Sequence, residues 1–429
     1  MRKRSLSQAH AAPARGRAHG TRDRHPRAGK RGSHRSPGSS PLLDPREAAH
    51  ADLALAGTLA LDIVLEAADA AVPADRLLKA RLRDAHLAPA AAAVTARLVF
   101  CWYRWRGFLQ GAEPASDTLA RTLELAERYA AEPGRFDAAA LIDGAVPGWL
   151  RLHMEVREAF VRALQAEPVI WLRARPGQAR ELAAHLPGAR AGAAPALPDA
   201  LRYTGESDLF RTAAFNQGRF EIQDIASQAV GVVCHPRPGE TWWDACAGEG
   251  GKTLHLADLM HNRGLLWASD RSTARLAVLR RRAARAGIFN YRAVAWDGGA
   301  RPPTRTQFDG VLVDAPCSGV GTWQRNPHAR WTAGPADVRE LAAIQLRLLD
   351  TAAGSIKPGG RLVYAVCTLT RDETTAVAEA FADKHPEFEP AAFADPFAPG
   401  AAPVAQAAWE PQQSGGNGMF VAAWRRVSR

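Results

Sequence analysis

The fold is decided by one stretch, Thr241-Trp-Trp-Asp-Ala-Cys-Ala-Gly-Glu-Gly-Gly-Lys-Thr253, in which an apolar strand runs into a glycine-rich loop. Glycines between a strand and a helix let backbone N–H groups approach an anionic ligand at the helix N-terminus. A phosphate-binding P-loop would need a glycine where Cys246 stands, and a dinucleotide-binding loop would need one at Thr253. Both nucleotide-binding patterns therefore fail on spacing. A loop that cradles the methionine end of S-adenosylmethionine fits better.

Strands alternate with helices around this loop, from about residue 221 onward. We expect strands over residues 241–246, 264–270, 291–296, 308–314 and 361–366, and helices over 254–261, 273–286 and 336–356. Gly287 is a natural cap for the second helix, and the turn Lys357-Pro-Gly-Gly360 should end the third. The alternation predicts a Rossmann-like, doubly wound α/β domain with a mostly parallel sheet over residues 221–429.

The chain before this domain divides into three parts by its pattern. Residues 1–45 form a basic tail, and residues 46–165 show apolar residues at helical spacing, most clearly over 51–65 and 90–108. This spacing predicts an all-helical domain. Residues 166–220 predict a small α/β connector, with a short strand near Val169–Arg173 and a helix over 178–185.

One aromatic cluster in the helical part admits two interpretations. The stretch Cys101-Trp-Tyr-Arg-Trp-Arg106 could stack on nucleic-acid bases. More commonly, such aromatic side chains anchor a helical core while the arginine heads reach solvent. We favour the second interpretation.

The net charge of +11 is concentrated at the N-terminus, because residues 1–40 hold eleven Lys or Arg and one acid. This segment has almost no apolar residues, which predicts disorder. It could bind RNA phosphates without sequence preference. A merely solubilising extension is an equal alternative. An organelle transit peptide is a third, although the amphipathic pattern of such peptides is missing.

The five cysteines contain no C-x-x-C pair, so we expect no zinc site. Their odd number favours free thiols in a reducing compartment, and therefore a cytoplasmic protein. The chain has no apolar run of about 18 residues and no apolar stretch after its basic start, so neither a membrane span nor a secretory signal is expected.

Acidic residues stand at the ends of three successive strands. Asp270 ends the second strand, about twenty residues after the loop, where a carboxylate can accept both ribose hydroxyls. Asp297 is expected to end the third strand, within reach of an adenine edge, and Asp314 the fourth. Any single acid more commonly caps a turn or faces solvent. Three in equivalent places favour a nucleoside site.

Two cysteines follow neighbouring strands of the predicted sheet. Cys317 follows the fourth strand and Cys367 the fifth. Ligands bind beyond the carboxyl ends of such strands, and adjacent strands lie about 4.8 Å apart, so both thiols would border one crevice. A lone cysteine is more often a buried structural residue. A thiolate that adds to C6 of cytosine, however, makes C5 nucleophilic enough to take a methyl group, and a second group must then release the product.

Several motifs in the same order resemble the NOL1/NOP2/Sun family of RNA cytosine-5 methyltransferases. They are Glu221–Gln228, Cys246–Thr253, Asp314-Ala-Pro-Cys-Ser-Gly-Val-Gly-Thr322, Arg325-Asn-Pro327, Arg330-Trp331 and Lys357-Pro-Gly-Gly with Tyr364-Ala-Val-Cys-Thr368. The resemblance covers roughly residues 165–425. The helical part resembles more faintly the NusB-like RNA-binding domain of the family's bacterial branch, which includes the ribosomal RNA small-subunit methyltransferase B type.

This resemblance implies S-adenosylmethionine as cofactor, RNA as partner, and a role for each matching residue. Cys367 corresponds to the nucleophile, and Cys317 to the cysteine that helps release the product. Asp314 corresponds to an acid that contacts cytosine and cofactor, and Lys252 to an active-site lysine. The implied cofactor contacts are Cys246, Ala247, Gly248, Glu249, Gly250, Gly251, Lys252, Asp270, Arg275, Asp297 and Asp314.

The chain departs from the family pattern at three places. Glu249 stands where the family usually has proline, Val366 where it has threonine, and Asn417-Gly-Met-Phe420 where it has Asp-Gly-Phe-Phe. A carboxylate at 249 could repel the cofactor carboxylate or meet its ammonium group. None of these departures removes a catalytic group, so they bear on substrate and affinity more than on the type of reaction.

The most specific expectation is a monomeric enzyme that methylates C5 of cytosine in RNA, ribosomal RNA above all. A DNA cytosine-5 methyltransferase is one alternative, and its nucleophile would be Cys317. A non-catalytic RNA-binding assembly factor is another. The presence of Cys367 and of Arg330-Trp331 favours RNA over DNA, and the intact Lys252, Asp314 and cysteines favour an enzyme.

Overall fold

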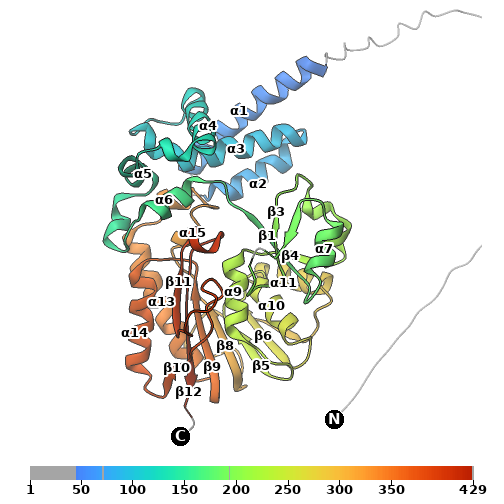
Figure 1. Cartoon of the computed structure of the whole chain (residues 1–429), viewed down its shortest axis with the longest axis vertical. Helices are drawn as coiled ribbons and strands as arrows, with labels where there is room; N and C mark the ends of the chain where they lie inside the picture. The colour runs from blue at the N-terminus through green and yellow to red at the C-terminus, as the bar shows by residue number, and fades with distance from the viewer. Residues whose placement is uncertain (1–44, 70–71, 193, 428–429) are drawn as a thin grey trace, which may run out of the picture. The chain divides into compact units, whose positions relative to one another are not determined.

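The computed structural model describes residues 45–69, 72–192 and 194–427 (Figure 1). From Ala49 onward the chain forms one compact unit, so the expected boundaries between a helical, a connecting and an α/β domain stay predictions. The expected tail, residues 1–45, lies outside the described residues except for its last position. Within the described ranges, no helix combines the length and apolar character that crossing a membrane requires.

Helices and short 3-10 turns make up the described chain as far as Gln165. The helices are α1 (Pro45–Asp69), α2 (Ala74–Ala85), α3 (Pro89–Trp105), α4 (Ser116–Ala131), α5 (Ala138–Ala145) and α6 (Glu158–Gln165). Local signals start them: Pro89 occupies the first turn of α3, and the Asp137 side chain caps α5 by accepting from Ala140 N at 2.9 Å. The predicted helical N-terminal region is confirmed.

The aromatic cluster in α3 belongs to the core of this region. Trp102, Tyr103 and Trp105 are all at most 3 % exposed, which supports the structural interpretation over base stacking. The expectation that the arginine heads reach solvent is wrong for Arg104. This side chain is buried and donates to the backbone oxygen of Gln324 at 3.2 Å.

A small antiparallel sheet follows the helices, with strand order β2-β3-β1-β4. Its strands are β1 (Ile170–Ala174), β2 (Ala189–Ala191), β3 (Ala200–Tyr203) and β4 (Phe220–Ile222). Leu172 and Leu201 are paired in register and buried against Leu182 of α7 (Ala179–His185). The expected short strand and helix are therefore both present.

The larger sheet has eight strands in the order β10-β12-β9-β8-β5-β6-β7, with β11 paired to β12. The strands from β9 to β7 run parallel, and β12, β10 and β11 join antiparallel, so the sheet is mixed but mostly parallel as predicted. Its strands are β5 (Thr241–Asp244), β6 (Leu265–Asp270), β7 (Tyr291–Ala295), β8 (Phe308–Asp314), β9 (Ile356–Val366), β10 (Phe388–Pro390), β11 (Gln406–Trp409) and β12 (Met419–Arg426).

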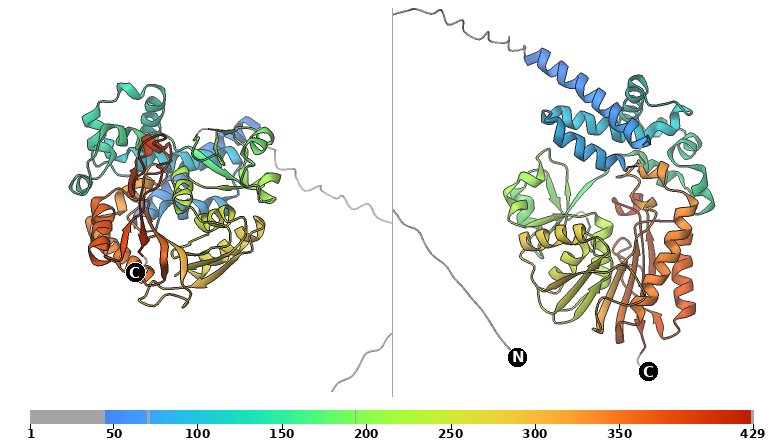
Figure 2. Two further views of the ribbon diagram at one scale, coloured as in Figure 1. Left: turned by 60° about the horizontal axis from the view of Figure 1, so that its bottom comes forward. Right: turned by 180° about the vertical axis from the view of Figure 1, so that it is seen from behind.

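Helices cover both faces of this sheet (Figures 1 and 2). One core lies between the sheet and the helices α9 (Ile225–Cys234), α10 (Gly251–Leu259) and α11 (Thr273–Arg285). The other lies against α13 (Pro335–Ala353) and α14 (Thr375–Lys384). The chain order reverses between β5 and β8, because β6 and β7 lie on the other side of β5. Such a switch point is where ligands bind in doubly wound folds.

Two local expectations need correction. The turn Lys357–Gly360 interrupts β9 instead of preceding it: Phe308 pairs with Ile356 and Gly310 with Arg361, so one residue of β8 faces four of β9. The helix expected to begin at Leu254 begins at Gly251, because Gly251, Lys252 and Thr253 already form its first turn after the N-cap Gly250. The predicted cap at Gly287 is confirmed by its φ of 65°, directly beyond α11.

A buried arginine joins the helical region to the large sheet. Arg330 lies in α12 (Ala329–Thr332), between β8 and α13, and is fully buried. Its guanidinium donates to oxygens in the last turns of three helices: the backbone oxygens of Arg104 in α3, Ala145 in α5 and Leu164 in α6, and the Gln165 side chain. Helix carboxyl ends carry partial negative charge, so they can hold a cation without an acidic partner.

Candidate active site

Two glycines shape the loop between β5 and α10. Gly248 and Gly250 have φ values of 55° and 88°, in the left-handed region that favours glycine. A Cβ atom on Gly250 would also lie 2.6 Å from Cγ of Leu279. The N–H of Gly250 donates to the Ala247 oxygen at 2.8 Å, so the loop closes tightly just before α10 begins. This is the geometry that the glycine spacing predicts.

Asp270 ties the loop to the end of β6. Its Oδ2 accepts from the backbone N–H of Gly248 at 3.0 Å, and its Oδ1 accepts from Ser272 N at 2.8 Å. Arg275 lies beside the same carboxylate, with Nη1 at 3.4 Å from Oδ2. The structure therefore brings Asp270, Arg275 and the loop together, as expected for a shared cofactor site.

Asp297 does not end β7 as expected. The strand stops at Ala295, and Asp297 lies two residues further on with an exposed side chain. Its Oδ1 accepts from the N–H of Gly299 at 2.9 Å and so stabilises its own turn. Of the three acids that were expected to end successive strands, only Asp270 and Asp314 do so. A contact of Asp297 with the cofactor stays a prediction.

Lys252 and Asp314 form an ion pair beyond the carboxyl ends of the central strands. The Nζ atom of Lys252 lies 2.8 Å from Oδ2 of Asp314, and the Lys252 side chain is buried. Burial alone would lower the pKa of Lys252. The Asp314 carboxylate outweighs that effect, and the pKa of Lys252 is raised. The lysine is therefore held as a cation at the edge of the predicted crevice.

The two thiols that were predicted to be catalytic lie side by side. Asp314 pairs with Ala365 in the parallel ladder of β8 and β9, so the loops that follow the two strands leave the sheet side by side. The Sγ atoms of Cys317 and Cys367 lie 3.3 Å apart, and both cysteines are free thiols. The expectation that the two thiols lie side by side after adjacent strands is confirmed, while a crevice that they border stays a prediction.

The surroundings of the two thiols differ. The hydrogen bond with Cys317 and, to a smaller extent, the positive charge of Lys252 lower the pKa of Cys367 against the opposing effects of burial and of the Asp314 charge. The same hydrogen bond, burial and the nearby charges of Cys367 and Glu373 raise the pKa of Cys317. The pKa shifts of the two thiols therefore have opposite directions, downward for Cys367 and upward for Cys317. The roles that the family resemblance implies for them stay predictions.

A group of residues that the sequence analysis missed surrounds the cysteine loops. Glu373 and Gln345 are fully buried and hydrogen-bond to residues on either side of Cys317. The only signal in the sequence was an acid six residues after Cys367, within the polar stretch Thr368–Glu373. That signal shows no partner, because Gln345 comes from the distant helix α13.

The departure at Glu249 is accommodated by the loop. The Glu249 side chain is exposed, and its backbone oxygen accepts from Nη1 of Arg282 at 3.0 Å. The same guanidinium pairs with the buried Glu221 at 2.9 Å. Arg282 and Glu221, which sequence reasoning also missed as a pair, thus hold the loop where proline would have stiffened it.

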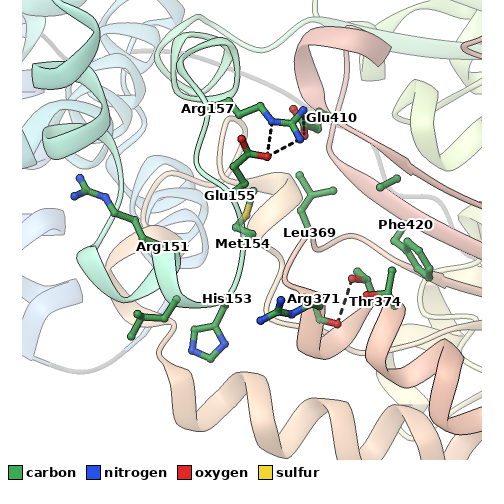
Figure 3. Close-up of a pocket in the computed structure, with 13 residues that line it drawn as sticks. Arg151, His153, Met154, Glu155, Arg157, Leu369, Arg371, Thr374, Glu410 and Phe420 are labelled. Atoms are coloured by element: carbon green, nitrogen blue, oxygen red, sulfur yellow. Dashed lines mark hydrogen bonds and ion pairs between the residues drawn. The ribbon is translucent and has the colours of Figure 1, made fainter.

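A cavity of about 440 Å³ lies next to the cysteine loops (Figure 3). It is lined on one side by the segment Arg151–Arg157 and on the other by Leu369, Arg371 and Glu410. Arg157 is paired there with Glu155 and Glu410, as Figure 3 shows. The residues that line it do not include any predicted catalytic or cofactor residue.

Comparison with known proteins points to the same family that the sequence motifs resemble. Residues 231–425 match the family described as 16S rRNA methyltransferase RsmB/F. A "Probable ribosomal RNA small subunit methyltransferase B" of Bacillus subtilis is 40% identical over 181 residues, which cover 42% of this chain and 40% of that protein. The "Ribosomal RNA small subunit methyltransferase B" of Erwinia tasmaniensis is 32% identical over 270 residues, or 61% of each chain.

The fold also has a solved counterpart. The crystal structure of PH0851 superimposes with a TM-score of 0.71 at 23% identity, over 86% of this chain and 98% of that one.

The chain spans about half the length of the curated relatives it matches, between 40% and 61%. The stretch that matches the RsmB/F family, residues 231–425, contains the glycine loop, the Lys252–Asp314 pair and both cysteines, so this part of the chain is similar to the 16S rRNA methyltransferases of that family.

Proposed function

We propose that this protein methylates C5 of a cytosine in RNA, with S-adenosylmethionine as methyl donor. The observation that carries the proposal is the pair of thiols 3.3 Å apart beyond the ends of β8 and β9, beside Lys252 and Asp314. The names of the curated relatives point to small-subunit ribosomal RNA, and we propose 16S rRNA as the substrate.

The glycine loop and its neighbours suit the cofactor. Gly248 and Gly250 let the loop backbone pass close to the Arg275 and Leu279 side chains, where a Cβ would collide, and the Asp270 carboxylate stands at the loop. Oδ1 of the buried Asp244 accepts no hydrogen bond from any described residue, which leaves one acceptor free beneath the loop. When bound, S-adenosylmethionine supplies an electrophilic methyl group. We assign its binding to residues 246–252, Asp270, Arg275 and Asp314.

The protein's own residues account for the remaining steps. Cys367 Sγ, as a thiolate, forms a bond to C6, and the electron pair of the C5–C6 double bond becomes available at C5. After methylation, C5 loses its proton and the C6–S bond breaks, which restores the ring and the thiolate. We assign to Cys317 the acceptance of the C5 proton, for which the Cys317 thiol must first lose its own proton to solvent. We assign the placing of the cytosine to Asp314 and the stabilisation of the Cys367 thiolate to Lys252.

The two cysteines can be separated on one denaturing gel. With S-adenosylmethionine and cellular RNA, Cys317→Ala should accumulate a slowly migrating protein–RNA adduct, because it can attack but not release. Cys367→Ala should form none. Cys101→Ala, which removes a buried thiol from the helical core, is the control and should behave as the wild-type protein.

The same gel decides between the alternatives. A DNA-type mechanism predicts the reverse pattern, with the adduct from Cys367→Ala. A non-catalytic assembly factor predicts no adduct from any variant. Bisulfite sequencing of rRNA from a deletion strain, with and without the intact gene restored, then identifies the cytosine; methylation of 16S rRNA that survives the deletion would refute the proposed substrate.

A further inference from the structure

Glu373 is a buried carboxylate that the mechanism above does not use. It ends the 3-10 turn Arg371–Glu373 between β9 and α14. Its Oε1 accepts from Ser318 N at 2.9 Å and from Gln345 Nε2 at 3.0 Å. Its Oε2 accepts from the hydroxyls of Ser318 and Thr370. All these donors are neutral, so the carboxylate is satisfied by dipoles and not by a cation.

These bonds connect the two cysteine loops. Ser318 directly follows Cys317, and Thr368, which directly follows Cys367, lies with its hydroxyl 2.9 Å from that of Ser318 and 3.4 Å from Oε2 of Glu373. One carboxylate therefore bridges the residues next to both thiols.

The loop of Cys317 is held on its other side as well. Gln345, itself bonded to Glu373, donates to the backbone oxygen of Pro316 at 2.9 Å. The Tyr364 hydroxyl lies 2.9 Å from the Gln345 side-chain oxygen and 2.6 Å from the backbone oxygen of Glu373. Cys317 is thus fixed through both of its chain neighbours, by residues from α13 and from the turn before α14.

The charge of Glu373 is not needed for this geometry. A glutamine at the same place could accept from Ser318 N and Gln345 with its oxygen and donate to the hydroxyls with its nitrogen, since hydroxyls also accept. Burying a carboxylate costs free energy that an amide would avoid. A negative charge beside the Cys317 loop favours the protonated form of that thiol, whereas Lys252 stands on the side of Cys367.

We propose that Glu373 is a positioning residue of the cysteine pair: it holds the two thiols together and makes Cys367, not Cys317, the stronger nucleophile. The inference rests on the proposed function in taking Cys367 as the attacking thiol. It goes beyond that function in assigning the unequal reactivity of the two thiols to a residue that touches neither substrate nor cofactor.

Alkylation of the full chain by iodoacetamide at neutral pH, without RNA, tests the proposal. Peptide mass spectrometry gives the alkylation rates of Cys367 and Cys317 separately, and their ratio is the readout. The variants are Glu373→Gln, which keeps the geometry and removes the charge, and Glu373→Ala, which removes both. Glu379→Gln, on the exposed side of α14, is the matched control.

In the wild-type protein and the control, Cys367 should react faster. In Glu373→Gln the ratio should fall by about three- to tenfold at a melting temperature no lower than that of the wild-type protein, and in Glu373→Ala it should fall further. If the ratio is unchanged in Glu373→Gln, the charge of Glu373 does not set the unequal reactivity of the two thiols, and that part of the proposal is overturned. An unchanged ratio in a folded Glu373→Ala overturns the proposal as a whole.

The readout does not depend on the RNA reaction. If none of the cysteine variants forms an adduct, the proposed function fails, yet the alkylation ratio still reports whether Glu373 governs the pair. If the ratio is unchanged while Cys317→Ala forms its adduct, the proposed function stands and Glu373 is only structural.

Discussion

Arg330 and Glu373 are both fully buried charges held by neutral hydrogen-bond partners, yet they lie in regions with different tasks. Arg330 joins three helix ends to the segment after β8, and most of its acceptors belong to the last turns of α3, α5 and α6. Glu373 joins two loops that each carry one thiol of the Cys317–Cys367 pair. The difference teaches that one physical device, a buried charge satisfied by dipoles, can serve stability in one region and reactivity in another.

The comparison also explains which replacement each site tolerates. The donors of Arg330 are aimed at backbone oxygens of α3, α5 and α6, and no shorter side chain can reach all of them. The partners of Glu373 are mostly groups that an amide can also satisfy. Loss of charge should therefore disrupt the fold at Arg330 and mainly change chemistry at Glu373.

The largest effect is expected from Arg330→Met. The substitution keeps an apolar stem but leaves several buried backbone oxygens without donors, so the free energy of unfolding should fall by about 3–5 kcal/mol. Urea unfolding followed by circular dichroism measures this change. Arg339→Met, on the exposed side of α13, is the control and should stay within about 0.5 kcal/mol. A loss below about 1 kcal/mol at Arg330 would break the comparison.

A third buried ionisable group, Asp244, extends the comparison of Arg330 and Glu373 to a side chain with fewer hydrogen-bond partners. Asp244 has one donor, Thr253 Oγ1 at 2.7 Å to Oδ2, and its Oδ1 has none among the described residues. Burial raises the pKa of Asp244 to about 7 from its ordinary value of 3.8. A raised pKa stabilises the fold fully below the unfolded value, and this stabilisation is lost as pH rises toward the folded value.

We therefore expect wild-type stability to fall relative to Asp244→Asn by about 2–3 kcal/mol between pH 5 and pH 8. Urea unfolding of both proteins at the two pH values isolates this difference, because all other titrating groups are shared. Asp383→Asn, at an exposed position of α14, should show no such pH dependence. Parallel stability curves for wild type and Asp244→Asn would show that the carboxylate is satisfied after all.

The smallest expected effect concerns Lys252, the cation on the side of Cys367. Replacing it in Lys252→Met should raise the pKa of Cys367, because one cause of the lowered value is the lysine charge. Iodoacetamide alkylation of Cys367 at neutral pH should then slow by about threefold to tenfold. Lys357→Met, which removes a cation from the irregular part of β9, is the control. Equal rates for both variants would show that the Lys252 charge does not contribute to the unequal reactivity of the two thiols.

The sequence by itself determined the α/β alternation, the glycine loop and the placement of both cysteines after adjacent strands. These features depend on local turn chemistry and on side-chain periodicity, which a single stretch of chain reveals. The same reasoning wrongly placed Asp297 at the end of β7, because the end of this strand depends on its pairing with β6 and not on a turn signal. It also misplaced the Lys357–Gly360 turn, which is absorbed into the register of β9 against β8.

Only the tertiary structure decided the partners of the buried charges. Arg330 and the oxygen of Gln165 are 165 positions apart, and Glu373 meets Ser318 across 55 and Gln345 across 28. No periodicity connects such residues, because each contact exists only after the helices and strands have packed. The local pattern thus predicts after which strands the two cysteines stand, while the packing decides how far apart the two thiols lie and which charged groups surround each of them.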